Sequence, residues 1–200
     1  MADRYWIGGT ATWDSTTTTV WSTTSGGTGG ASVPTASDNV FFDQAGTYTV
    51  TVDANPAYCA NFTVSASGYT FSTGVGYFRI AGNFTLVSGT VWNISAFYFT
   101  ASSGTCTVTT NGTTLKNINS FGLSGSTAIW SMQDALTCSN IGGIVGTLNT
   151  NGYNITAGGI QGGPSGTRAI NMSTSQFTLA SGGNVAFYFI FKLTWSAGAK

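Results

Sequence analysis

Apolar and polar residues alternate through most of the chain. The alternation is clearest at residues 47–52 (TYTVTV), 61–64 (NFTV), 69–71 (YTF) and 105–110 (TCTVTT). A period of two places every second side chain on the same face of a strand, and Thr, Val, Phe and Tyr favour strands. Gly, Ser and Asn separate these runs, and no segment shows the period of a helix. The pattern predicts an all-β protein built from short strands.

Short segments also recur along the chain. TVTTNGTTL at 107–115 resembles TLNTNGYNI at 147–155, and NFT occurs at Asn61 and again at Asn83. CANF at Cys59 is echoed by CSNI at Cys138. These separations are near two, one and four times a unit of about 20 residues, a period typical of solenoids. We therefore predict a parallel β-solenoid (β-helix) with rungs of roughly 20 residues.

In such a stack, small apolar residues face inward, and Asn or Thr form side-chain ladders at the bends. Cys59 and Cys138 are then interpreted as one inward rung position seen twice, with Asn61 and Asn140 as candidate ladder residues. The rung register is not predicted between Phe121 and Val145, where SFGLSGSTAIWSM and IGGIVG interrupt the alternation.

The alternative fold is an antiparallel β-sandwich or jelly roll, which also consists of many short strands. Asn111-Gly112 and Asn151-Gly152 favour it locally, because Asn-Gly is a strong signal for a two-residue hairpin turn. The recurrence of similar segments along the chain favours the solenoid instead.

The two ends of the chain differ from its middle. Residues 1–45 are rich in Trp, Gly and Ser, and we expect them to form a cap or attachment segment that covers the open first rung. Residues 46–185 form the solenoid repeats in this interpretation, and the aromatic segment 186–200 is a predicted interface. The aromatic residues assigned to the cap are Trp6, Trp13 and Trp21, and those assigned to the interface are Phe187, Phe189, Phe191 and Trp195.

Charge is scarce, since only 6% of the 200 residues are charged and the net charge is zero. The basic residues are scattered singly, which argues against nucleic-acid binding. The chain contains no His, which excludes Ser-His-Asp catalytic triads and the commonest zinc-ligand sets. No cofactor is predicted. Three cysteines cannot make a complete disulfide framework and are expected to be small buried residues. We also expect no signal peptide and no membrane insertion, because the longest apolar run is too short.

Paired carboxylates are the remaining catalytic possibility, and Asp38, Asp43 and Asp53 lie close together in the sequence. Aspartates commonly end strands and bond in turns, and the raised-pKa general acid of such sites is often Glu, which this chain lacks. Their spacing matches no calcium loop. We therefore predict a protein that is not an enzyme and holds no metal.

Aromatic side chains that face outward could stack on sugars. The candidates for glycan stacking or for an interface are Trp92, Trp130, Tyr98 and Tyr153. Packing in the core is the more frequent role of such large side chains.

The N-terminal stretch RYWIGGTATWDSTTTTVWSTTSGGTGGASVPTASDNVFFD resembles the N-terminal segment of tailed-bacteriophage virion structural proteins of the tail-fibre or surface-fibre type. SGTCTVTTNGTTLKNI, MQDALTC and TLNTNGYNITAGGI are similar to the β-solenoid repeats that follow it there. The resemblance extends over residues 4–185 and includes no catalytic motif.

The resemblance implies a non-enzymatic virion protein that forms part of a fibre, spike or capsid decoration, with roles in assembly and host-surface adhesion. By analogy, the partners are other copies of the chain, as in a trimer, and other virion proteins. The expected location is the phage particle, after synthesis in the host cytoplasm. Two other classes stay open: a carbohydrate-binding module that recognises a host glycan, and a spike glycosidase.

Overall fold

The computed structural model describes residues 1–74, 76–161, 166–179 and 194–197. Every regular element in these ranges is a β-strand, and almost all of the pairing between strands is parallel. None of the described residues belongs to a helix that is long and apolar enough to span a membrane.

The strands form three sheets, here named A, B and C. Sheet A contains β1 (Asp3–Trp6), β4 (Asn39–Phe42), β7 (Phe62–Val64), β10 (Phe84–Thr85), β13 (Thr105–Thr109), β15 (Ile129–Met132), β17 (Gly146–Asn149), β19 (Arg168–Ser173) and β21 (Thr194–Ala197), with β3 (Trp21–Ser22) at its edge. Sheet B contains β2 (Ala11–Trp13), β5 (Tyr48–Val52), β8 (Tyr69–Thr73) and β11 (Val91–Asn93). Sheet C contains β6 (Ala57–Cys59), β9 (Phe78–Ile80), β12 (Phe97–Phe99), β14 (Leu115–Phe121), β16 (Leu136–Ile141), β18 (Ile155–Ala157) and β20 (Phe177–Leu179).

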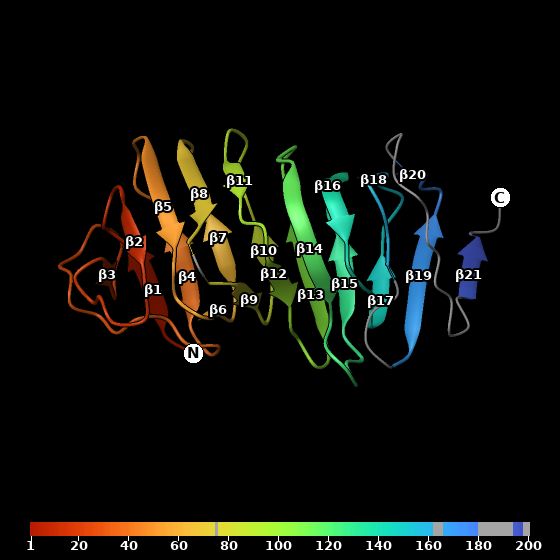
Figure 1. Cartoon of the computed structure of the whole chain (residues 1–200), viewed down its shortest axis with the longest axis horizontal. Helices are drawn as coiled ribbons and strands as arrows, with labels where there is room; N and C mark the ends of the chain where they lie inside the picture. The colour runs from red at the N-terminus through yellow and green to blue at the C-terminus, as the bar shows by residue number, and fades with distance from the viewer. Residues whose placement is uncertain (75, 162–165, 180–193, 198–200) are drawn as a thin grey trace.

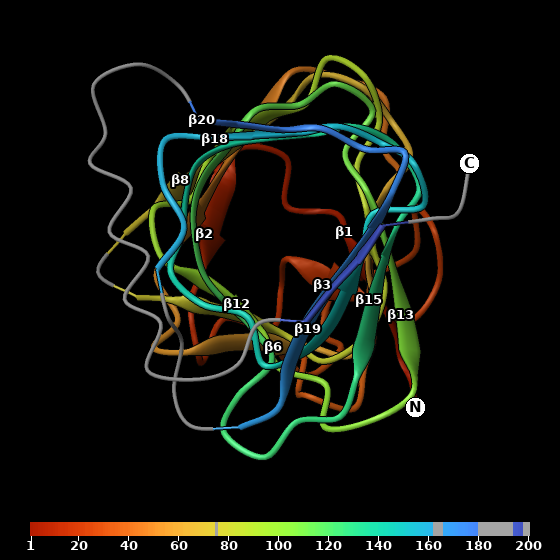
Figure 2. The same cartoon turned by 90° about the vertical axis from the view of Figure 1, so that its right-hand side faces the viewer.

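The chain coils through these sheets in order, and each turn lies beside the next (Figure 1). Val40 pairs with Phe62, which pairs with Phe84 one turn further on. Viewed along the stack, the successive turns superpose into one closed outline (Figure 2). The predicted parallel β-solenoid is confirmed. The antiparallel sandwich is wrong, because the only antiparallel pair among the described strands is β1 with β3.

The turns vary in length around the predicted unit of about 20 residues. The turn that joins Trp130 to its partner Leu148 is shorter than this unit, whereas the turn from Ile170 to Trp195 is longer. Sheet B ends at β11, and from β13 onward a tight turn leads directly from sheet A to sheet C. The solenoid therefore has three sheets in its N-terminal half and two in its C-terminal half.

Asn111-Gly112 and Asn151-Gly152 form two of these tight turns. Their φ angles are 46° and 80° in the first and 51° and 88° in the second, the left-handed values expected of Asn-Gly turns. Each Asn Nδ2 donates to a carbonyl of the preceding turn of the solenoid, Leu86 O at 2.6 Å and Met132 O at 2.7 Å. A tight turn occurs at each Asn-Gly pair, but these turns join two different sheets, so the hairpins that the pairs favoured are wrong.

Large aromatic side chains fill the N-terminal half of the core, in place of the small inward residues expected. Rings from adjacent turns stack: the Phe62 and Phe84 centroids are 5.6 Å apart, and those of Phe99 and Phe121 are 4.8 Å apart. Stacked rings bury much apolar surface and add favourable ring contacts. Aliphatic residues such as Leu148 replace them towards the C-terminus.

Tryptophans close the N-terminal end of the stack. β1 and β2 pair in parallel with β4 and β5, so residues 3–13 form the first turn, and residues 14–38 lie over its open side at the left of Figure 1. Trp6, Trp13 and Trp21 are fully buried. The Trp21 ring lies 5.0 Å from that of Trp6 and 4.9 Å from that of Trp13.

At the other end, Phe187, Phe189 and Phe191 lie outside the described residues. Trp195 belongs to β21, whose backbone pairs with β19.

Asparagines form a ladder along the bend that leads into sheet A. Asn39 Nδ2 donates to Asp3 Oδ1 at 2.8 Å, and Asn61 Nδ2 donates to Asn39 Oδ1 at 2.7 Å. Asn61 Oδ1 accepts the Asn83 backbone N–H at 2.7 Å, and Asn83 Oδ1 accepts that of Thr107 at 2.8 Å. The recurrence of NFT is therefore one turn of the solenoid, and Asn61 is a ladder residue as predicted.

Cys59 and Cys138 do not share a rung position. They lie four strands apart in sheet C, on β6 and β16, as their separation in the sequence predicted. Cys59, however, belongs to the column of Ile80 and Phe99, whereas Cys138 pairs with Leu115. The interpretation as one inward position was wrong because β14 is longer than its neighbours and shifts the register.

Candidate functional site

The three aspartates considered for catalysis stand apart. Asp38 precedes β4 and Asp43 follows it, so their Cα atoms are roughly 16 Å apart along an extended strand. Glycosidase carboxyl pairs lie within about 9.5 Å of each other. Asp53 follows β5, in a different sheet. The fold does not bring these carboxylates together.

Asp38 has a local structural role at the N-terminus. Its carboxylate accepts the Thr35 backbone N–H at 3.0 Å, the Thr35 hydroxyl at 2.8 Å and the Ala2 backbone N–H at 3.2 Å. Burial raises the pKa of Asp38, but these hydrogen bonds outweigh burial, so the pKa lies below its usual value. The ionised Asp38 side chain thus holds the segment that leads into β4 in place.

The cysteines are buried free thiols, and burial raises the pKa of each. Among the described residues, no group of three or more His, Cys, Asp or Glu side chains could hold a metal ion. The protonated, enclosed thiols act as small apolar side chains in the core.

The four aromatic candidates separate into two groups. Trp92 and Trp130 are buried in the core and reach no surface. Tyr98 is partly buried on the outer face of β12, and Tyr153 is 42% exposed in the turn after β17. Only the two tyrosines remain available for stacking on a ligand.

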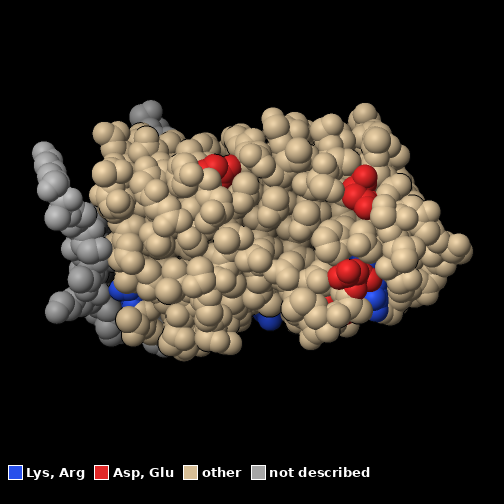
Figure 3. All heavy atoms as spheres, turned by 180° about the vertical axis from the view of Figure 1, so that it is seen from behind, with Lys and Arg blue, Asp and Glu red and all other residues tan. Residues whose placement is uncertain are grey.

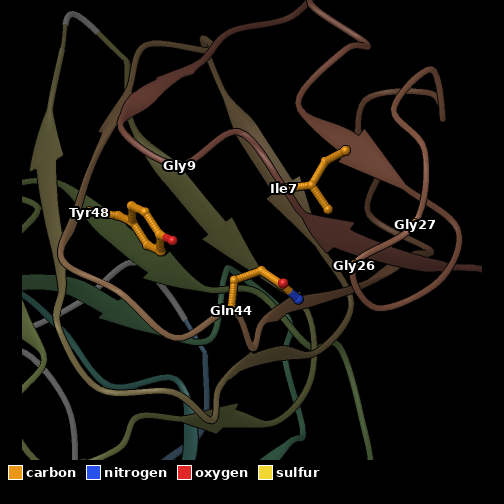
Figure 4. Close-up of a pocket in the computed structure, with 6 residues that line it drawn as sticks. All are labelled: Ile7, Gly9, Gly26, Gly27, Gln44 and Tyr48. Atoms are coloured by element: carbon orange, nitrogen blue, oxygen red, sulfur yellow. The ribbon is translucent and has the colours of Figure 1, made fainter.

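A pocket of about 310 Å³ lies between the first turn and the segment that covers it. Figure 4 shows Tyr48 and Gln44 on one side, Ile7, Gly26 and Gly27 on the other, and Gly9 between Tyr48 and Ile7. The Tyr48 hydroxyl donates to Ala45 O at 3.0 Å, and Gln44 Nε2 donates to Asp43 Oδ1 at 2.6 Å. Since these polar groups already bond within the protein, the pocket offers few free groups for a ligand.

A second site lies on the outer face of sheet C. Tyr58 on β6, Arg79 on β9 and Tyr98 on β12 are direct neighbours in three successive strands. The Arg79 guanidinium carbon is 5.9 Å from the centroid of the Tyr58 ring, 5.2 Å from that of Tyr77 and 5.8 Å from that of Tyr98. We call these four residues the Arg79 cluster.

Hydrogen bonds and ring contacts hold the cluster in place. The Tyr77 and Tyr98 centroids are 5.8 Å apart in an edge-to-face arrangement, and Asn119 Nδ2 donates to the Tyr98 hydroxyl at 3.3 Å. Guanidinium groups over aromatic faces are attracted to the electron-rich rings. The arrangement fixes a cation at a defined position on sheet C, whose other charged residue among the described strands is Lys116 on β14.

The Arg79 cation lacks a partner of opposite charge within the described chain. Its Nε is buried without a hydrogen-bond partner, and neither terminal nitrogen donates to a described residue. A guanidinium presents five N–H donors in a planar fork that matches a carboxylate or a phosphate. The Arg79 cluster can therefore bind an anionic group and, on the tyrosine rings, a flat apolar face.

Only Tyr98 of this cluster was identified from the sequence. Tyr58, Arg79 and Tyr98 occupy one outward rung position, so an alignment of the repeats by their outward residues would have placed them together. More residues separate Tyr58 from Arg79 than separate Arg79 from Tyr98. A search of the sequence for one fixed period therefore misses that the three residues are neighbours.

The remainder of the surface carries few charges. Figure 3 shows a face that is mostly uncharged, with a few small acidic and basic patches, one acidic patch lying beside a basic one. Comparison of the chain with protein-family models, curated proteins and solved structures finds no match to any of them.

Proposed function

We propose that this chain is a non-enzymatic structural protein of a bacteriophage particle, forming part of a fibre, spike or capsid decoration. The observation that carries the proposal is the continuous stack of parallel turns, closed at its N-terminal end by buried tryptophans. A solenoid in which each turn contacts only its neighbours makes an extended, stiff element. The resemblance of residues 4–43 to virion proteins supports a role for this element on a phage particle.

The surface chemistry suits a protein that packs against copies of itself. Thr-rich strands with few charges can approach each other without the repulsion or desolvation that exposed charges cause. We propose a homo-oligomer, a trimer by analogy with phage fibres, whose further partners are other virion proteins.

Sedimentation and labelling of particles test this function. Antibodies against the purified chain should label one position on particles from the lysate that contains it, and the chain should stay with the particles through washing. Analytical ultracentrifugation of the purified chain should show an oligomer. A stable monomer that never associates with particles contradicts the proposal.

A second candidate is a glycan-binding module, which the Arg79 cluster specifically favours. Tyrosine rings on an outer sheet face provide flat apolar surfaces with hydroxyl groups, and such amphipathic rings suit ligands that are partly apolar. Binding of the purified chain to a glycan array, and its loss on Tyr58→Leu, test this function. An array with no bound glycan contradicts it.

A further inference from the structure

We propose that the Arg79 cluster binds acidic glycans, with the guanidinium pairing with a sugar carboxylate and the tyrosine rings stacking on the sugar. The inference rests on the glycan-binding candidate and adds the charge of the ligand. It is independent of whether the chain belongs to a virus particle, because it depends only on the residues of the site.

The position of Arg79 points to a ligand outside the chain. An arginine that serves only the fold usually satisfies its donors with carbonyl or carboxylate groups, because a buried donor left unpaired is costly. Here the guanidinium lies among three rings, its Nε is buried without a partner, and its terminal nitrogens donate to none of the described residues. An incoming anion would pair with the terminal N–H donors.

Five of the six acids of the chain accept hydrogen bonds at other places in the structure. Asp3 accepts the amide of Asn39, Asp38 binds Thr35, and Asp134 caps the backbone at Thr110. These contacts anchor bends at other places in the solenoid. An acid brought by a ligand is therefore the partner of Arg79 that charge complementarity favours.

The geometry of the cluster favours an extended ligand over a single small anion. Tyr58 and Tyr98 flank Arg79 by one strand on each side, so the rings span about 10 Å along the stack at roughly 4.8 Å per strand. A sugar chain lying along the stack can place one ring on each tyrosine and its carboxylate at Arg79. A guanidinium pairs with a carboxylate through two parallel hydrogen bonds, which fixes orientation as well as charge.

Titration calorimetry with oligogalacturonate, using the full chain, tests the inference. The control ligand is the same oligosaccharide with its carboxyl groups reduced to alcohols. Oligogalacturonate should bind at least about tenfold more tightly than the reduced ligand, and Arg79→Gln should abolish that difference. Lys116→Gln is the matched control, because Lys116 is an exposed cation on sheet C outside the cluster and its loss should leave binding unchanged.

The outcomes separate the inference from the function on which it rests. Equal binding of both ligands, unchanged in Arg79→Gln, overturns the acidic-glycan inference but keeps glycan binding. Binding of neither ligand, together with an empty array of acidic and neutral glycans, overturns both. If Arg79→Gln lowers the sedimentation coefficient and leaves glycan binding unchanged, the cluster is a protein interface and the inference is wrong.

Folding of the variant is checked by its thermal unfolding. Should Arg79→Gln fail to fold, Arg79→Lys keeps the charge over the rings but lacks the planar fork. It should then retain only part of the preference for the acidic ligand. If Arg79→Lys keeps the full preference for the acidic ligand, the two parallel hydrogen bonds between the guanidinium and the carboxylate are not needed, and that part of the proposal is wrong.

Discussion

Replacing Asn61 with Ala removes the centre of the asparagine ladder. The substitution deletes the 2.7 Å bond from Asn61 Nδ2 to Asn39 Oδ1 and the 2.7 Å bond from the Asn83 N–H to Asn61 Oδ1. Each such bond contributes about 1 kcal/mol net. Water can reach part of the bend and replace some of this loss. Two bonds of this strength predict that the free energy of unfolding falls by about 1–2 kcal/mol.

Urea denaturation followed by tryptophan fluorescence measures this loss. The midpoint should fall while the slope of the transition stays constant, because the exposed area on unfolding hardly changes. Asn93→Ala is the control: Asn93 is an exposed asparagine on β11 whose side chain makes no hydrogen bond within the described residues. Its effect should stay within about 0.5 kcal/mol.

A double-mutant cycle distinguishes the ladder from a general effect of losing an amide. Asn39→Ala and Asn61→Ala share a bond, so their effects should couple by at least about 0.5 kcal/mol. Asn61→Ala and Asn140→Ala should be additive, because Asn140 bonds to Asn117 in another sheet. Additivity of the first pair, or a loss no larger than that of Asn93→Ala, refutes the reasoning.

Three further predictions concern packing, thiols and acid stability. Phe62→Ala should lower the free energy of unfolding by about 3–5 kcal/mol, because the fully enclosed ring stacks on Phe84 of the next turn; urea denaturation would contradict this with a loss below about 1 kcal/mol. All three buried thiols should resist a thiol reagent in the native protein and react after denaturation. Burial raises the pKa of Cys138 to about 12, so the free energy of unfolding should decline as pH rises above about 8.5, the pKa of an unfolded thiol. Hydrogen bonds, chiefly from the Thr17 hydroxyl, lower the pKa of Asp14 to about 2. The ionised Asp14 therefore stabilises the fold fully above about pH 4, and this stabilisation is lost as pH falls towards 2. Thermal unfolding of Asp14→Asn should show a smaller loss of stability over this pH range, and an unchanged dependence on pH would contradict the assignment.

Much of the fold is predictable from the sequence, because its signals are local and repeat. The NFT recurrence reports one turn directly, since Asn61 and Asn83 are neighbours in the ladder. Asn-Gly turns are less informative, because the same left-handed residues close a hairpin or turn a corner between sheets. Whether the chain forms a hairpin or enters another sheet depends on which strand the next segment pairs with. That pairing depends on packing across the whole cross-section of the solenoid.

The register between Phe121 and Val145 was not predictable for a physical reason. The pairing of β12 with β14 contains an irregularity, in which Tyr98 pairs with Ser120 while its neighbour Phe97 pairs with Ile118. One added residue reverses the alternation of inward and outward positions beyond that point. The run after Ile118 therefore reads as out of phase with the earlier rungs.

The candidate site depended on this register more than the fold did. Trp92 and Trp130 looked as suitable for ligand stacking as Tyr98, because alternation identifies two faces of a strand but does not say which is inner. The contacts of Arg79 arise between turns of unequal length, so composition and spacing alone could not assemble them.

A disulfide between adjacent turns tests the parallel solenoid most directly. Thr63 and Thr85 are register partners on β7 and β10, and both side chains are partly exposed. The variant carrying Thr63→Cys and Thr85→Cys should form the cross-link on mild oxidation, as shown by peptide mass spectrometry, because neighbouring strands bring the Cα atoms within disulfide reach. Thr63→Cys with Thr109→Cys, two strands apart, should not. Failure of the first pair, or equal cross-linking of both, would contradict the stacked parallel turns on which the proposed functions rest.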